Sequence, residues 1–221
     1  MSGPPSLIID LDGTLVDSAP LIAGIINQML ADRGSPRTVA ASEARIFLTQ
    51  GGSQLVTALL GPDLDDLDRD LADFRIRYAA LQTPADCLFP GVRDGLDALS
   101  ALGVRMAICS NKPQSLCDKI IVDLALDHHF VAIVGSTDGV PMKPAPDLAF
   151  RALAQLGTTA PDCRYVGDSD VDQQTAANAE IGFLFVTYGY AEQGQPIDAL
   201  ARFDCFDQIA PFISALQRRV A

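Results

Sequence analysis

The chain has no tryptophan, two histidines and five cysteines. His128 and His129 are adjacent and lie outside any His-x-x-His or Glu-x-x-His pattern, so we expect neither a histidine-based metal centre nor a Ser-His-Asp triad. The cysteines are odd in number, widely spaced and without a CxxC pair, which argues against a zinc ribbon or a disulfide framework. We therefore expect reduced thiols, and any catalysis is expected to depend on carboxylates.

Long apolar runs and basic residues are also scarce. No run of ~18 apolar residues predicts a membrane span, and residues 1–7 lack the basic and apolar regions of a secretory signal. We therefore expect a cytoplasmic protein, either a monomer or a homodimer. Lys and Arg number 16 against 28 Asp and Glu, a net charge of −12. This charge argues against a general nucleic-acid binder, and an anionic substrate would need local cations to approach.

The alternation of two kinds of segment predicts the fold class. Hydrophobic residues make up 48% of 221 residues, enough for one sizeable core. Short Ile- and Val-rich runs alternate with segments of helical period, which is typical of a doubly wound, mainly parallel, Rossmann-like α/β sheet. The expected strands are Ser6–Asp10, Val104–Cys109, Val131–Gly135, Arg164–Gly167 and Phe183–Thr187. The expected helices are Val92–Leu102, Gln114–Leu126, Pro146–Leu156, Asp172–Ala179 and Asp207–Val220.

One interval breaks this alternation. From about Pro20 to Asp86 the sequence offers helical segments and no convincing strand. Leu21, Ile25 and Met29 belong to an apolar stripe at helical spacing. We expect an inserted helical cap at residues 20–86, with the core domain formed by residues 1–19 and 87–221.

Polar residues follow four of the expected strands. Asp10 and Asp12 come directly after the first apolar run, where open α/β sheets bind ligands. Alone, this motif is also typical of an Asp-rich turn before a helix. Three further sets follow later strands: Ser110-Asn111-Lys112, Lys143 between prolines, and Asp168 with Asp172. Because the carboxyl ends of parallel strands meet at one edge, we expect all four sets to converge on one crevice.

The motifs DLDGTLVDS, SNK, KPAPD and GDSDVD resemble those of the haloacid dehalogenase-like phosphatases. The order of the motifs and the helical insertion are most similar to the phosphoglycolate phosphatase branch. The resemblance implies a nucleophile at Asp10, a general acid and base at Asp12, and charge neutralisation by Lys143. It further implies that Thr14, Ser110 and Asn111 bind the phosphoryl group. The implied Mg²⁺ ligands are Asp10, Asp168 and the backbone carbonyl of Asp12. Asp172 is implied to support this site without binding the metal directly.

Elementary chemistry agrees with these implied roles. A carboxylate and a phosphate dianion repel each other, and Mg²⁺ prefers the hard oxygen ligands that aspartates supply. An aspartyl-phosphate divides one difficult displacement into two easier ones. Asp12 would first protonate the leaving alkoxide and then take a proton from water. The expected activity is hydrolysis of a small phosphorylated metabolite, with 2-phosphoglycolate as the substrate.

The expected cap contains a candidate specificity segment at Phe47–Gly52. Its glycines allow close approach of backbone N–H groups to a ligand. Arg45, Thr49, Gln50 and Gly51 are the candidate substrate-binding residues. On the sequence alone, Gly51-Gly52 fits a flexible connector equally well, and a solvated helix arginine is the default interpretation of Arg45.

Four other functions are considered at this point. A sugar-phosphate mutase would share every core motif, and a phosphate-binding or regulatory protein would have lost catalysis. A dehalogenase is disfavoured, because Asp12, Gly13 and the acidic residues of the last motif suit phosphate chemistry. A nucleotide-binding protein is weaker still, because neither GxxxxGK[ST] nor GxGxxG follows a strand.

The last motif departs from the family pattern at Glu180, where the family usually has a glycine that ends the helix in a left-handed conformation. Either the turn differs here, with Gly182 ending it, or the chain loses some stability.

Overall fold

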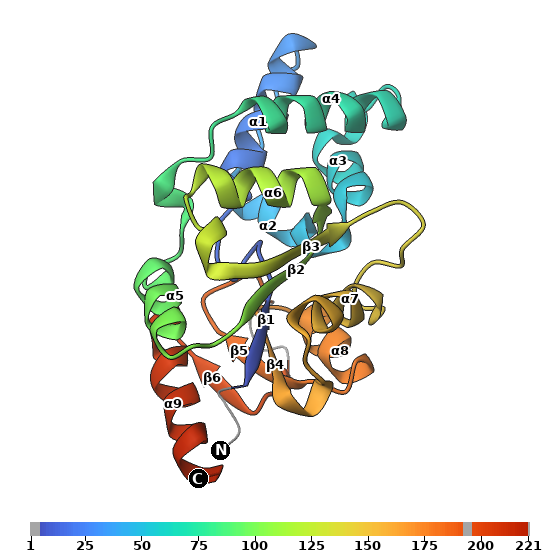
Figure 1. The fold of residues 1–221 in the computed structure, drawn as a ribbon. Coiled ribbons are helices and arrows are strands. Elements are labelled where there is room, and N and C mark those ends of the chain that lie inside the picture. Colours follow the sequence, from blue (N-terminus) through green and yellow to red (C-terminus); the bar gives the residue numbers. More distant parts are fainter. Residues whose placement is uncertain (1–4, 192–195, 221) are drawn as a thin grey trace.

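The computed structural model describes residues 5–191 and 196–220, apart from the side chains of Gln50, Arg219 and Val220. Its described strands form one sheet in the order β3-β2-β1-β4-β5-β6, and every neighbouring pair is parallel. The strands are β1 (Ser6–Ile9), β2 (Met106–Pro113), β3 (Phe130–Ser136), β4 (Cys163–Gly167), β5 (Gly182–Val186) and β6 (Ala201–Phe203). The predicted doubly wound α/β fold is confirmed (Figure 1).

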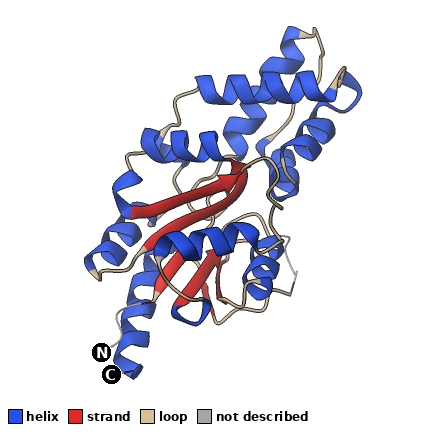
Figure 2. Ribbon diagram, turned by 45° about the vertical axis from the view of Figure 1, so that its right-hand side comes forward, coloured by secondary structure: helices blue, strands red, loops and turns tan. Residues whose placement is uncertain are grey.

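Helices cover both faces of this sheet (Figures 1 and 2). The core helices are α5 (Val92–Ala101), α6 (Gln114–Asp123), α7 (Asp147–Leu156), α8 (Asp170–Asn178) and α9 (Ile209–Val220). In β1, successive side chains point to opposite faces. Leu7 and Ile9 therefore join the cluster of α5, α6 and α9, whereas Ile8 joins the cluster of α7 and α8. Burial on both faces explains the continuous apolar runs.

A group of helices is inserted between β1 and β2. These are α1 (Ala19–Asp32), α2 (Ala41–Phe47), α3 (Gly52–Leu60) and α4 (Leu67–Ala80), with a short 3-10 turn at Leu48–Gln50. The stripe seen in the sequence is buried at Ile25, Ile26 and Met29. Figure 1 shows this group beyond the sheet, next to α6. Within the described residues, every helix is too short or too polar to cross a membrane.

Two details of the sheet differ from the sequence prediction. Strand β6 was not predicted, because three residues are too few to show a strand period. Strand β2 begins later than expected and runs on to Pro113 instead of ending at Cys109. Ser110 and Lys112 therefore lie within β2, at its carboxyl end, and not in a loop after it. The register of β2 with β3 shifts between Cys109 and Pro113, so this end of the strand is irregular.

The turn after α8 answers the question raised by Glu180. Glu180 has φ of 58°, in the left-handed region, and the Ile181 N–H donates to the Ala176 carbonyl at 2.8 Å. The helix therefore ends with Glu180 in the position that suits glycine. The alternative in which Gly182 ends the turn is wrong, because Gly182 begins β5.

Candidate active site

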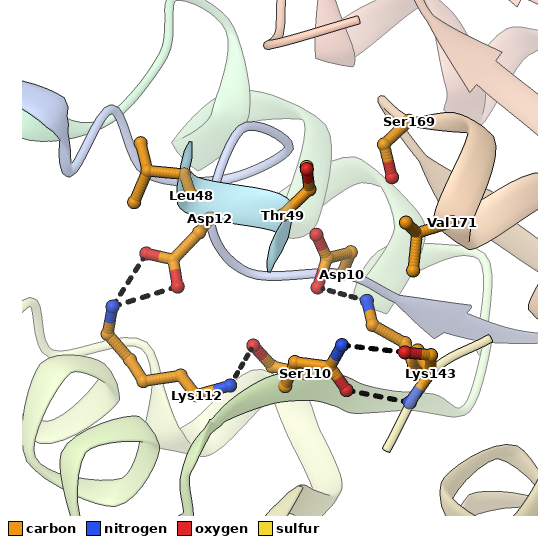
Figure 3. Close-up of a pocket in the computed structure, with 10 residues that line it drawn as sticks. Asp10, Asp12, Leu48, Thr49, Ser110, Lys112, Lys143, Ser169 and Val171 are labelled. Carbon is orange, nitrogen blue, oxygen red and sulfur yellow. Dashed lines mark hydrogen bonds and ion pairs between the residues drawn. The ribbon is translucent and has the colours of Figure 1, made fainter. Parts of the chain in front are cut away.

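The carboxyl ends of β1, β2 and β4 meet where the strand order reverses on either side of β1, the usual place for a ligand site in such sheets. A small cavity of about 30 Å³ lies there (Figure 3). Its lining residues are Asp10, Asp12, Leu48, Thr49, Ser110, Asn111, Lys112, Lys143, Ser169 and Val171. All four polar motifs of the sequence therefore contribute a residue, and the turn before α3 contributes two more.

Lys143 is buried and joins two motifs. Its Nζ lies 2.7 Å from Asp10 Oδ1 and 2.7 Å from Asp172 Oδ1. The Nζ also donates to the Cys109 carbonyl at 3.2 Å. With a relative exposure of 7%, this lysine is not a solvated loop cation. Its position places a positive charge directly beside the carboxylate at the end of β1.

The side chain of Asn111 holds the Lys143 segment in place. Its Nδ2 donates to the Lys143 carbonyl at 3.0 Å, and its Oδ1 accepts from the Lys143 N–H at 2.7 Å. Both ends of the amide are therefore engaged with backbone. Phosphoryl binding by Asn111 stays a prediction, and the contacts show that the residue also fixes the position of Lys143.

Asp168 is held from two sides next to this pair. Thr14 Oγ1 donates to its Oδ1 at 3.0 Å, and the Tyr190 N–H donates to its Oδ2 at 2.6 Å. A Cβ on Gly13, whose φ is 92°, would lie 2.3 Å from Asp168 Oδ2. The Asp-Gly step of the first motif is therefore required sterically, because any side chain there would displace the carboxylate.

Asp172 lies in the first turn of α8 and is fully buried. Its Oδ2 accepts from Ser169 Oγ at 2.6 Å, while its Oδ1 faces Lys143. Ser169 Oγ accepts in turn from the Asp172 N–H at 3.2 Å, which completes a capping box at the start of the helix. Both carboxylate oxygens thus have partners within the protein.

The site holds more negative than positive charge. Carboxylate oxygens of Asp10, Asp168 and Asp172 lie within 4.8 Å of one another, and all three residues are buried. Burial, together with Asp172, raises the pKa of Asp10 to about 7, and burial raises the pKa of Asp168 well above its ordinary value. Lys143 offsets one of these charges. A divalent cation that prefers hard oxygen ligands can balance the remaining negative charge.

Asp12 has a different partner, Lys112, to which the sequence reasoning gave no role. Lys112 Nζ donates to both carboxylate oxygens of Asp12, at 2.9 and 2.8 Å, and Ser18 Oγ donates to Oδ1. The ammonium also lies 4.7 Å from the centre of the Tyr78 ring on α4. The position of Lys112 in the SNK motif, directly after Ser110 and Asn111, was the one signal in the sequence that it lies near the site.

The predicted specificity segment borders the site. Thr49 lines the small cavity and also a larger one of about 570 Å³. Arg45, whose side chain is 48% exposed, lines the larger cavity and pairs with Asp17 at 2.6 Å. Gly51, with φ of 88°, lines a separate cavity of about 260 Å³, called the second cavity below. The side chain of Gln50 lies outside the described residues.

A doubly wound parallel sheet with two lysine-bound aspartates directly after strand β1 suits an enzyme whose catalysis depends on carboxylates. The sequence profile of the haloacid dehalogenase-like hydrolases matches residues 7–186. The chain belongs to this family, and it is a phosphatase, as the named relatives described next indicate.

Named relatives are similar to this chain in sequence, and solved structures are similar to it in fold. A phosphoglycolate phosphatase from Rhodobacter capsulatus is 36% identical over 213 residues, covering 93% of this chain and 94% of the relative. One from Cupriavidus necator is 38% identical over 196 residues, covering 86% and 84%. The crystal structure of a predicted phosphoglycolate phosphatase from Haemophilus somnus has a TM-score of 0.82 at 26% identity, covering 96% and 99%.

Proposed function

We propose that this phosphatase hydrolyses 2-phosphoglycolate to glycolate and inorganic phosphate with the help of Mg²⁺. The observation that carries the proposal is the convergence of Asp10, Lys143 and Asp168 at the carboxyl end of β1. Relatives named as phosphoglycolate phosphatases, at up to 38% identity, support the choice of substrate. We also propose a cytoplasmic location, and a monomer or a homodimer.

Asp10 is the proposed nucleophile. Lys143 holds one of its oxygens at 2.7 Å and offsets its charge, which lowers the repulsion between the carboxylate and an incoming phosphate. Asp10, Asp168 and the backbone carbonyl of Asp12 would hold Mg²⁺, which would neutralise further negative charge. The carboxylate attacks phosphorus, the ester bond breaks, and an aspartyl-phosphate forms before water cleaves it.

Asp12 is the proposed general acid and base. Asp12 must carry a proton when the substrate binds; it would give this proton to the leaving alkoxide and later take one from the attacking water. Ser110, which lines the same small cavity, would bind the transferred phosphoryl group with Thr14 and Asn111. Asp172 would act through Lys143, because its Oδ1 is the second carboxylate contact of that ammonium.

We further propose that residues 20–86 act as a cap whose segment Phe47–Gly52 selects the substrate. Leu48 and Thr49 already border the small cavity. A space of about 30 Å³ holds one or two waters, so a phosphoryl group enters only if lining groups move. In the cap, Arg45 and Gln50 are the candidates for contacting the far end of the substrate.

The test is a screen of phosphorylated metabolites with metal-stripped protein. We expect turnover only after Mg²⁺ is added, inhibition by Ca²⁺, and a higher kcat/KM for 2-phosphoglycolate than for p-nitrophenyl phosphate. Calcium takes more ligands at longer distances and would misplace the phosphate. Arg45→Ala and Gln50→Ala should lower kcat/KM more for 2-phosphoglycolate. Full turnover in excess chelator would contradict the metal dependence.

Two competing functions are decided by the same assay. A sugar-phosphate mutase would need a bisphosphate activator and release little phosphate. A phosphate-binding protein without catalysis would bind phosphate and show no turnover with any ester. Phosphate release from 2-phosphoglycolate without an activator excludes both.

A further inference from the structure

A second cavity lies next to the proposed phosphoryl position. It has a volume of about 260 Å³ and is bordered by the end of β2, by the start of α3 and by α4. Its charged lining residues are Asp12, Lys112 and Arg75. Lys112 and Asp12 also line the small cavity, so these two residues form the boundary between the two spaces.

The charge of this second cavity is opposite to that of the whole chain. The chain carries a net charge of −12. Within the cavity, Lys112 already neutralises Asp12 through contacts of 2.8 and 2.9 Å, which leaves the charge of Arg75 in excess. In the part of the chain that the structure describes, Arg75 has no ion-pair or hydrogen-bond partner. A small cationic region inside an acidic protein attracts an anion locally.

Lys112 is placed to exchange partners. An ammonium group has three N–H donors, and two of them are directed at the carboxylate of Asp12 (Figure 3). On the side of the inserted helices, the face of the Tyr78 ring lies 4.7 Å from Nζ, a contact that stabilises the cation without fixing its direction. An anion in the second cavity can therefore reach Lys112 in competition with Asp12.

We propose that Lys112 and Arg75 form a subsite for a second anionic group of the substrate. The inference rests on the proposed phosphatase function. The ligand class is a short phosphate monoester that carries a second anion a few atoms from the phosphate. An anion that binds Lys112 lies beside Asp12, the proposed general acid, because Lys112 Nζ contacts both carboxylate oxygens of Asp12. The subsite thus places recognition of the organic end next to the leaving oxygen.

The second anion can be a carboxylate or another phosphate, and three substrates separate these sources. 2-Phosphoglycolate carries a carboxylate, a sugar bisphosphate carries a phosphate, and p-nitrophenyl phosphate carries neither. The variants are Lys112→Met, Lys112→Arg and Arg75→Gln. Arg69→Gln is the matched control, because Arg69 lies on the same helix with a side chain that is 66% exposed and pairs only with neighbouring Asp65.

The measurement is kcat and KM for each substrate and variant, with thermal unfolding to verify folding. A lost charge-assisted contact lowers kcat/KM roughly 10- to 100-fold. We expect this loss for 2-phosphoglycolate in Lys112→Met, and a loss at least about tenfold smaller for p-nitrophenyl phosphate. Lys112→Arg should restore part of the activity. Arg75→Gln should mainly raise KM, and Arg69→Gln should match the wild type.

Each outcome bears on a different claim. Equal losses on the substrates with and without a second anion, in both Lys112→Met and Arg75→Gln, would overturn the subsite and leave the phosphatase function standing. If the wild type prefers a sugar bisphosphate and the variants lose that preference, the subsite stands and 2-phosphoglycolate is wrong. If Lys112→Met fails to fold, Arg75→Gln decides, because Arg75 is an exposed residue whose replacement leaves the core intact.

Discussion

Replacing Lys143 by methionine removes the positive charge that Asp10 and Asp172 share. Both carboxylates lie 2.7 Å from Nζ, and the lysine side chain is 4% exposed. Removing one partner of a buried ion pair costs about 3–5 kcal/mol, because the other charge stays buried and unpaired. We therefore expect Lys143→Met to lower the free energy of unfolding by about this amount. Since the same ammonium would face the transferred phosphoryl group, kcat/KM should fall about 100- to 1,000-fold.

A double variant separates the two effects. Adding Asp172→Asn to Lys143→Met removes one of the unpaired carboxylates and should recover about 1–3 kcal/mol of stability, while activity stays low. Urea unfolding and phosphate release measure the two quantities. Arg69→Met is the control, because Arg69 pairs with Asp65 one turn away, both side chains are about two-thirds exposed, and the loss should be ~1 kcal/mol or less. A loss under ~1 kcal/mol in Lys143→Met, with kcat/KM within about threefold of wild type, would refute the reasoning.

Three further variants test separate parts of the structure. Asp10→Asn should fold normally and show no phosphate release, because an amide cannot be the nucleophile; turnover at the wild-type rate would instead favour direct attack by water. Glu180→Gly should raise the free energy of unfolding by up to about 1 kcal/mol, since φ of 58° strains a glutamate more than a glycine, and an unchanged urea midpoint would contradict this. Burial lowers the pKa of His129, so the contribution of His129 to stability should fall as pH drops from about 7 to 5, through the ordinary histidine pKa of about 6.5. Asp10 and Asp168, whose pKa values are raised, act in the opposite direction, so the contribution of His129 is measured as the difference between wild type and His129→Gln, and a difference that does not change with pH would contradict it.

The sequence predicted the structure best at positions where only one residue type satisfies the local geometry. Asp-Gly at residues 12–13 follows a fully buried strand, and the structure shows that only glycine fits beside Asp168. Lys143 stands between prolines just before a helix, and the structure shows that the side chain of Asn111 holds this segment. Because parallel strands align their carboxyl ends, the meeting of Asp10, Lys143 and Asp168 followed from their positions after successive strands.

Other features could not be read from the sequence, for physical reasons. The end of β2 was placed too early, because Ser110 and Asn111 are typical of turns and the strand period is lost in a polar segment. The register shift between Cys109 and Pro113 is a further feature that the sequence pattern does not show. The contact of Lys112 with Tyr78 joins residues far apart in the chain, and no local pattern encodes such a contact. Arg45 was expected near a substrate carboxylate, but its pairing with Asp17 depends on how α2 lies against the core.

Two aspartates in one motif have lysine partners of different character. The lysine of Asp10 is enclosed and shared with Asp172, whose other oxygen is fixed by Ser169. The position of Lys143, and with it that of Asp10, is therefore fixed by several contacts, as the positioning of a nucleophile requires. The lysine of Asp12 borders the second cavity and lies against the Tyr78 ring of the inserted helices. Lys112 is nearly as buried as Lys143, with side-chain exposures of 7% and 4%, but it has one carboxylate partner instead of two. The two lysines therefore differ in their partners and not in their exposure, and the larger set of contacts surrounds Asp10, the proposed nucleophile.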